Sequence, residues 1–108
     1  EKYAEKFNIT VVLKGAGTLV ANSRETAANH TGNAGMSRGG SGDVLAGIIG
    51  AIAAQGYNCF DASCAGVYIH GLAGDEAEKK LGQEAMLPRD IIDNLSDAFR
   101  ILKDKHKK

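Results

Sequence analysis

Gly39-Gly40-Ser41-Gly42-Asp43, which continues as Val44-Leu45-Ala46-Gly47-Ile48-Ile49, is the most informative stretch of this sequence. Its small residues free the backbone to approach a ligand closely, and an apolar helical pattern begins immediately after them. Such a junction points backbone N–H groups and the positive end of a helix dipole toward one place. The stretch therefore predicts an anion-binding site at the start of a helix.

Asp43 lies where this anion site would form. A carboxylate there would repel a phosphate that is merely bound. We therefore expect Asp43 to take a proton from a hydroxyl that attacks a phosphoryl group held by the loop. The simpler alternative is that Asp43 is a helix N-cap after a tight glycine turn.

Composition limits the class of protein. The 108 residues are the size of one small domain, and 13 basic residues balance 13 acidic ones, so we expect neither a nucleic-acid nor an anionic-membrane partner. No apolar stretch approaches the roughly 20 residues of a membrane span. Cys59 and Cys64 lack metal-ligand spacing, and Cys64 is expected to be a buried thiol in a reducing cytoplasm. Residues 1–7 resemble the tail of a helix without an N-cap, so we expect the C-terminal part of a longer chain.

A long glycine-rich loop is expected over residues 31–42. Short strands are expected before it, because apolar and β-branched residues cluster between turn residues in that earlier part of the chain. The expected strands are Ile9–Leu13, Thr18–Ala21 and a weak third one over residues 25–30. Helices are expected after the loop: Asp43 to about Gln55, Asp61 to about Leu81 with Asp61 as its N-cap, and a last helix that begins at Pro88.

The helix over residues 43–55 consists almost entirely of Gly, Ala and aliphatic residues. Glycine inside a helix costs about 0.5–1 kcal/mol relative to alanine, so we expect this helix to be buried on most sides with neighbours close to its backbone. On the next helix, His70 is expected to be a hydrogen-bonded core histidine and Asp75 a surface carboxylate. The last helix is expected to present one apolar face, made of Ile91, Ile92, Leu95, Phe99 and Leu102.

Several familiar phosphate-binding and catalytic motifs are missing from the sequence. No Gly-Lys-Ser/Thr follows a glycine loop, and the two Gly-x-Gly pairs lack the third small residue of a dinucleotide-binding fingerprint. There is no Gly-x-Ser-x-Gly turn. The three histidines have no metal-ligand spacing among themselves, so we expect no metal site built from protein ligands.

Four segments are specific when they are taken together. In chain order they are Lys14-Gly15-Ala16-Gly17-Thr18, Thr31-Gly32-Asn33-Ala34-Gly35-Met36, the stretch from Gly39 to Ile48, and Tyr68-Ile69-His70-Gly71-Leu72-Ala73-Gly74-Asp75. In this order and spacing they resemble the C-terminal half of the ADP/ATP-dependent NAD(P)H-hydrate dehydratases, a family of the ribokinase-like superfamily. The resemblance extends from about Ile9 to Leu102.

The resemblance implies an α/β fold, namely the C-terminal part of a ribokinase-like α/β/α sandwich in which short antiparallel strands are followed by three helices. It also implies a repair reaction. The terminal phosphoryl group of ADP or ATP is transferred to the hydroxyl of (6S)-NAD(P)H hydrate, and phosphate is then eliminated to restore NAD(P)H. The segment Lys14–Thr18 resembles the bacterial, ADP-using branch. The family's N-terminal half would be absent from residues 1–108, so this chain alone is expected to be inactive.

The resemblance also implies roles for individual residues. Asp43 would be the catalytic base and a substrate contact, and Asn33 a second substrate contact. The nucleotide would be bound by Lys14, Gly15, Ala16, Gly17, Thr18, Gly40, Ser41 and Gly42. Mg²⁺ would accompany the ADP or ATP. The expected partners are the hydrate and the adenine nucleotide, bound by a cytoplasmic homo-oligomer such as a tetramer.

Two alternative functions stay open on the sequence. A ribokinase-like kinase for a vitamin precursor or a sugar would use the same Asp43 but stop at the phosphorylated product, and fold alone does not separate the two. The other alternative, from a different class, is a non-catalytic nucleotide-binding fragment.

Overall fold

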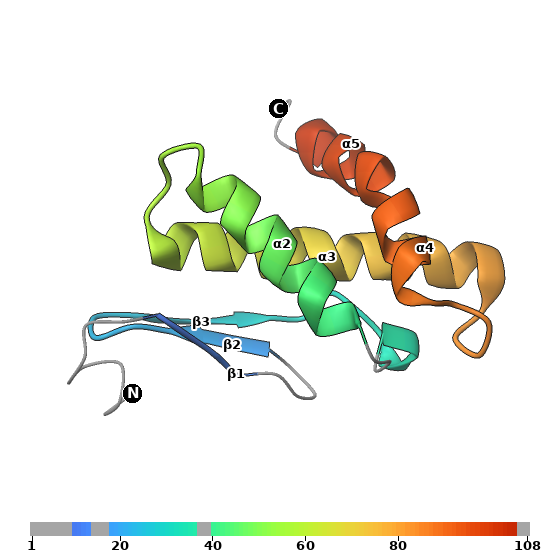
Figure 1. Ribbon diagram of the computed structural model, residues 1–108, viewed down its shortest axis with the longest axis horizontal. Helices are drawn as coiled ribbons and strands as arrows, with labels where there is room; N and C mark the ends of the chain where they lie inside the picture. The colour runs from blue at the N-terminus through green and yellow to red at the C-terminus, as the bar shows by residue number, and fades with distance from the viewer. Residues whose placement is uncertain (1–9, 14–17, 37–39, 106–108) are drawn as a thin grey trace.

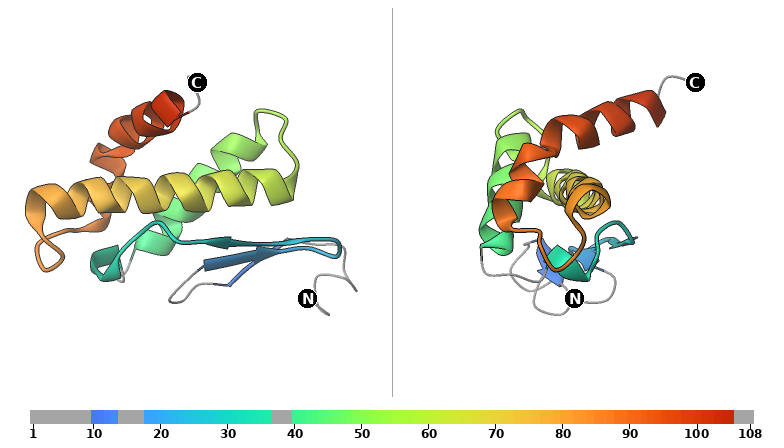
Figure 2. Two further views of the ribbon diagram at one scale, coloured as in Figure 1. Left: turned by 180° about the vertical axis from the view of Figure 1, so that it is seen from behind. Right: turned by 90° about the vertical axis from the view of Figure 1, so that its right-hand side faces the viewer.

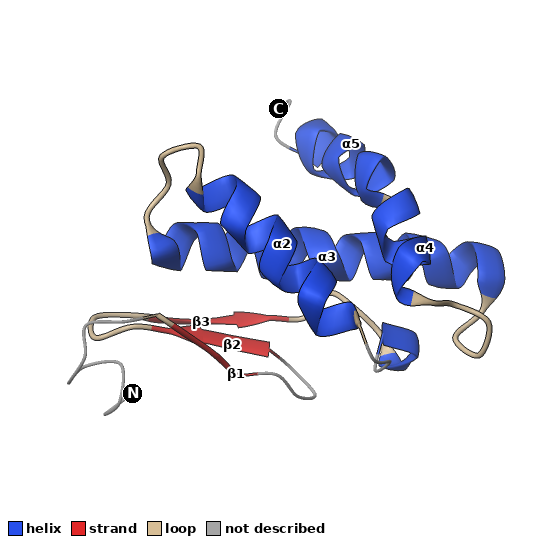
Figure 3. Ribbon diagram, viewed as in Figure 1, coloured by secondary structure: helices blue, strands red, loops and turns tan. Residues whose placement is uncertain are grey.

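The computed structural model describes residues 10–13, 18–36 and 40–105. Within them, three strands come first: β1 (Val11–Leu13), β2 (Thr18–Ala21) and β3 (Thr26–Asn29). A short 3₁₀ helix, η1 (Ala34–Met36), leads to the α-helices α2 (Ser41–Ala53), α3 (Cys59–Leu81), α4 (Pro88–Asp93) and α5 (Leu95–Lys105). Figure 3 shows the strands and the helices as separate layers. The expected class, short antiparallel strands followed by helices, is confirmed.

The sheet has the order β1-β2-β3, and both strand pairs are antiparallel. Val12 lies opposite Val20, and Val20 lies opposite Ala27, so these three side chains share one face. Val20 is 1% exposed and packs with buried side chains of α2 and α3. Figures 1 and 2 show α2 to α5 on one side of the sheet. The helices therefore form the second layer over a single face.

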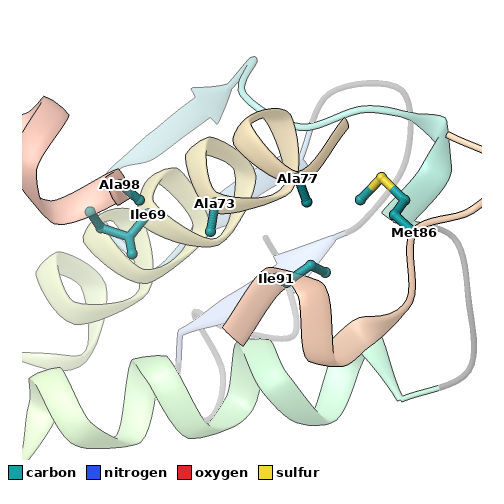
Figure 4. Packing of buried hydrophobic residues seen from close by; sticks show 6 residues of the cluster. All are labelled: Ile69, Ala73, Ala77, Met86, Ile91 and Ala98. Carbon is teal, nitrogen blue, oxygen red and sulfur yellow. The ribbon is translucent and has the colours of Figure 1, made fainter. Parts of the chain in front are cut away.

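The central element is α3, which contacts the sheet, α2 and the C-terminal helices. Gly66 permits its close approach to α2, because a Cβ there would lie 2.5 Å from Ile49 Cγ1. Further along α3, small and aliphatic side chains face α4 and α5 (Figure 4). This second cluster, in which every member is at most 1% exposed, consists of Ile69, Ala73, Ala77, Met86, Ile91 and Ala98. It fixes the C-terminal helices on α3.

Two helices begin earlier than the sequence predicts. Helix α2 starts at Ser41 after Gly40, whose φ of 97° is a left-handed conformation that favours glycine. Helix α3 starts at Cys59 after Asn58, whose Oδ1 accepts from the Asp61 N–H at 2.8 Å. The prediction that Asp61 is an N-cap is therefore wrong, and so is the alternative that made Asp43 one. The predicted end of α3 at Leu81 is confirmed, with Gly82 next at a φ of 78°.

The single last helix of the prediction is two helices, so four α-helices instead of three follow the strands in the described residues. Pro88 is the first residue of α4, as expected. The break falls at Asn94, whose Nδ2 donates to Asp90 O at 2.7 Å and whose Oδ1 accepts from Lys80 Nζ at 2.6 Å. The continuous apolar face is accordingly wrong, because Ile92 and Phe99 are half exposed whereas Ile91 is buried.

The expectation that α2 is buried on most sides is wrong for this chain. Of its residues only Ser41 and Leu45 are buried. A Cβ added at Gly47 or Gly50 would meet no heavy atom of the described chain within 4 Å. The face of α2 that carries these two glycines is therefore open in this structure.

Candidate functional site

The start of α2 is the candidate site. Gly40 precedes the helix, and Ser41, Gly42 and Asp43 form its first three positions. The Val44 N–H donates to Gly40 O at 3.2 Å, which closes the first turn of the helix. The N–H groups of the first three positions have no carbonyl partner within the helix, and they lie at the positive end of its dipole. Gly42 and Asp43 are both exposed, so an anion can reach this end of the helix.

Asp43 differs from the other aspartates at the same helix position. Asp61, Asp90 and Asp97 also occupy the third position of their helices. Each of these three carboxylates has a neighbour. Asp61 accepts from Asn58 Nδ2 at 3.1 Å, and Asp90 accepts from the Leu87 N–H at 2.7 Å. Asp97 pairs with Lys80 at 2.9 Å and with Arg100 at 2.7 Å. Among the residues that the structure describes, no such partner is seen for Asp43. Its exposed carboxylate is thus placed for a ligand.

Ser41 turns its side chain away from solvent. It is 3% exposed, and its Oγ lies 3.3 Å from Nε2 of His70, which is 7% exposed. Because the hydroxyl is engaged in this buried contact, what Ser41 offers to a ligand is its backbone N–H. The expectation that His70 is a hydrogen-bonded core histidine is confirmed.

The segment 31–36 lies along α3 and is fixed there by polar contacts. Thr31 Oγ1 donates to Tyr68 O at 3.1 Å, and the Gly32 N–H donates to Asp75 Oδ2 at 3.0 Å. Asn33 Nδ2 donates to Gly74 O at 3.1 Å and to Asp75 Oδ1 at 2.9 Å. The expectation that Asp75 is a surface carboxylate is therefore wrong: it is half-buried and joins two segments of the chain.

Glycines of α3 make room for this segment. A Cβ at Gly71 would collide with Thr31, whose carbonyl carbon would lie only 2.6 Å away, and one at Gly74 would collide with Met36. The two glycines are three residues apart and so share one helix face. Their spacing could have indicated a close contact, but the sequence gives no signal that its partner is the segment 31–36.

The predicted site residues fall into three groups. Gly40, Ser41, Gly42 and Asp43 come together at the start of α2. Asn33 is held on α3, and its Oδ1 also accepts from the Gly35 N–H at 2.9 Å. Thr18 begins β2 opposite Asn29, whose Nδ2 donates to Thr31 Oγ1 at 3.0 Å. Thr18 therefore lies at the end of the sheet from which the segment 31–36 departs. The predicted nucleotide contacts at 14–17 lie outside the described residues.

The described part of the chain does not form a metal site from its own side chains. It contains no group of three or more His, Cys, Asp or Glu side chains arranged to hold a metal ion. Magnesium keeps several waters and is usually bound through phosphate oxygens with one or two carboxylates. Within the described residues the site therefore offers an Mg²⁺ no cage of protein ligands, and the phosphate oxygens of a nucleotide would be its main ligands. No helix in these ranges is long and apolar enough to cross a membrane.

Neither cysteine is placed for chemistry at this site. Cys59 is exposed at the start of α3, and Cys64 is half-buried instead of buried as expected. Burial raises the pKa of the Cys64 thiol, and the carboxylates of Asp61 and Glu25 raise it further. The thiol is therefore protonated at neutral pH and a weak nucleophile.

Comparison with known proteins connects this geometry to a family. The sequence profile described as NAD(P)H-hydrate dehydratase matches residues 1–97. The chain is 44% identical over 105 residues to the bifunctional NAD(P)H-hydrate repair enzyme Nnr of Moorella thermoacetica, which covers 96% of this chain and 20% of that protein. It is 45% identical over 100 residues to the ADP-dependent (S)-NAD(P)H-hydrate dehydratase of Neisseria meningitidis, which covers 92% of this chain and 33% of that protein. The chain thus spans between a fifth and a third of these relatives.

A solved structure matches the fold as well. The ADP/ATP-dependent NAD(P)H-hydrate dehydratase from Bacillus subtilis, co-crystallized with ATP/Mg²⁺ and soaked with CoA, superposes with a TM-score of 0.85 at 26% sequence identity. The match covers 92% of this chain and 37% of that chain.

Proposed function

The chain belongs to the NAD(P)H-hydrate dehydratase family, and on that premise we propose that the protein containing it uses ADP to convert (6S)-NAD(P)H hydrate into NAD(P)H. The products besides NAD(P)H are AMP and phosphate. The observation that carries the proposal is the start of α2, where backbone N–H groups without a partner inside the helix and the exposed Asp43 carboxylate occupy one helix turn. This combination suits a reaction in which a phosphoryl group is bound while a hydroxyl loses its proton.

The first step is phosphoryl transfer. The hydrate hydroxyl attacks the terminal phosphorus of the nucleotide, Asp43 accepts the hydroxyl proton, and the bond to the leaving AMP oxygen breaks. The N–H groups at Gly40, Ser41 and Gly42 hold the charge that develops on the phosphoryl oxygens. Because the Ser41 hydroxyl is engaged with His70, its backbone N–H acts here and the side chain stays in the core.

The second step is elimination. The carbon–oxygen bond to the new phosphate group breaks, phosphate leaves, and a proton is lost from the neighbouring ring carbon, which restores the ring double bond. Asn33 and Asp43 contact the hydrate in this proposal. The side-chain bonds of Asn33 to α3 limit the direction in which its amide can approach a substrate.

In this proposal the nucleotide is bound by the start of α2 and by the segment Lys14–Thr18. The printed name of the Neisseria relative is ADP-dependent, which supports ADP as the phosphoryl donor. The Bacillus dehydratase was co-crystallized with ATP/Mg²⁺, which supports a magnesium–nucleotide complex. When bound, Mg²⁺ would neutralise phosphate charge.

A coupled assay of the complete protein that contains this chain tests the proposal. NADPH hydrate is incubated with ADP or with ATP, and the recovery of NADPH absorbance is followed together with the release of AMP, ADP and phosphate. We expect NADPH and phosphate to appear in equal amounts, and faster with ADP. A phosphorylated product that accumulates without release of phosphate would favour a kinase and overturn the proposal.

A further inference from the structure

The contacts along α3 point to Asp75, which the sequence analysis expected to be a surface carboxylate. We infer that Asp75 is a positioning residue for the dehydration: it fixes the segment 31–36 on α3 and thereby the approach to the phosphate-binding start of α2. The inference rests on the proposed function. Asp75 does not touch the start of α2 itself, so it acts through the residues that it holds.

Both carboxylate oxygens of Asp75 are used on this segment. Oδ2 accepts from the Gly32 N–H at 3.0 Å, and Oδ1 accepts from Asn33 Nδ2 at 2.9 Å. Asn33 in turn connects Asp75 to Gly35, because its Oδ1 accepts from the Gly35 N–H at 2.9 Å. We call this chain of bonds from Asp75 through Gly32 and Asn33 to Gly35 the latch. Hydrogen bonds with an ionised acceptor are stronger than neutral ones, so the two bonds to the Asp75 carboxylate are the strongest in the latch.

The latched segment has little other regular structure to hold it. Its helix η1 is three residues long, and the backbone bond inside it runs from the Met36 N–H to Asn33 O at 3.1 Å. Met36 packs against Gly74, where a Cβ would leave it no room. The segment therefore depends on α3 for its position.

The start of α2 follows this segment closely along the chain, since Gly40 is four residues beyond Met36. It is also tied to the same helix, because Ser41 Oγ lies 3.3 Å from His70 Nε2. Residues 68–75 of α3 thus hold both the segment 31–36 and the first turn of α2. A shift of the segment 31–36 relative to the first turn of α2 would therefore change the geometry at Asp43.

An asparagine at position 75 cannot replace the aspartate. Its amide has one oxygen acceptor, and its NH₂ group would face either the Gly32 N–H or Asn33 Nδ2, both of which are donors. Asp75→Asn therefore keeps the size of the side chain and breaks the latch. Glu76→Gln is the matched control, because Glu76 is the neighbouring carboxylate of α3 and pairs with exposed Lys79 at 2.8 Å.

The test compares the complete protein with its Asp75→Asn and Glu76→Gln variants, at a temperature where circular dichroism shows each to be folded. We expect Asp75→Asn to lower kcat about ten- to hundredfold, since a displacement of about 1 Å in a catalytic site has an effect of this size. Its affinity for ADP, measured by calorimetry, should stay close to wild type, because the contact between Ser41 and His70 still holds the start of α2. Glu76→Gln should match the wild type in both measurements.

Hydrogen exchange gives a second readout, which does not depend on activity. In the wild-type protein the Gly32 and Gly35 amides should exchange slowly, and in Asp75→Asn they should exchange faster. Rapid exchange of both amides in the wild type would overturn the latch. A folded Asp75→Asn variant with wild-type kcat would overturn the positioning role. A wild-type protein that releases no NADPH from the hydrate would instead overturn the proposed function, and the positioning role with it.

Discussion

At the scale of single residues, the position of Asp43 explains why the sequence alone left two interpretations open. A carboxylate in the first turn of a helix is favourable because of the helix dipole. Every α-helix described here has an aspartate at its third position, so this residue type is expected there without any function. What distinguishes Asp43 is that no partner for its carboxylate is seen among the described residues, whereas Asp61, Asp90 and Asp97 each have one.

Asp43→Asn tests the role of this carboxylate as a base. The substitution keeps the shape of the side chain but removes its ability to accept the hydroxyl proton. We expect nucleotide affinity to be retained and turnover to fall by roughly 10²–10⁴-fold, the usual contribution of a positioned general base. Asp61→Asn is the control, since Asp61 has the same helix position in α3. Near-normal turnover in Asp43→Asn would leave Asp43 with a structural role only.

Gly42→Val tests whether the backbone at the start of α2 approaches the nucleotide. Gly42 is exposed at the second position of α2, so we expect the added side chain to leave the core unchanged and to obstruct the approach of an anion to the first-turn N–H groups. ADP affinity measured by calorimetry should fall strongly. Ser96→Val places the same side chain at the second position of another helix, α5, where the residue is also exposed, and it should leave affinity unchanged. Equal affinity in the two variants would mean that the anion is held elsewhere.

At the scale of elements, local pattern predicted most of the fold. The strands and the order of helices followed from apolar runs and turn residues, and Gly82 and Pro88 marked a helix end and a helix start correctly. The break at Asn94 was missed because one of the two contacts that its side chain makes is with Lys80, fourteen residues away in the sequence. The role of Asp75 was missed for the same reason, since Gly32 and Asn33 are more than forty residues distant.

The difference in burial between two residues of α4 gives a prediction about stability. Ile91 is 1% exposed and Ile92 is 50% exposed, although the two residues are adjacent. Ile91→Ala should reduce the free energy of unfolding by about 2–5 kcal/mol, because it leaves a cavity between α3 and α4. Ile92→Ala should reduce it by less than about 1 kcal/mol. Urea denaturation of both variants measures the difference. Equal losses would show that Ile92 is covered in the complete protein.

At the scale of the whole molecule, two apolar surfaces have no cover within the described chain. One is the sheet face turned away from the helices, where Leu13 and Leu19 lie opposite each other and are 53% and 39% exposed. The other is the open face of α2 around Gly47 and Gly50. Each large apolar side chain left in water forgoes about 1.5–3 kcal/mol, which is a large share of the 5–15 kcal/mol that stabilises a typical domain.

We propose that further protein covers these surfaces, and that residues 1–108 form the C-terminal portion of a single ribokinase-like domain. The cover would be the rest of that domain or a second copy of the chain. The match to the Bacillus dehydratase supports this proposal, because it takes up 37% of that chain.

The last prediction concerns the 108 residues expressed alone. In dilute solution we expect them to self-associate or aggregate, because the apolar sheet face has no other way to leave water. Sedimentation velocity should therefore show species larger than a monomer. Replacing Leu13 and Leu19 together by lysine should shift the distribution toward monomer, since the charged side chains remove the apolar patch and repel a second copy. Leu81→Lys, at an exposed leucine at the end of α3, should have little effect. A monodisperse monomer of the unsubstituted chain that melts cooperatively would show that the sheet face needs no cover, and that these residues fold without further protein.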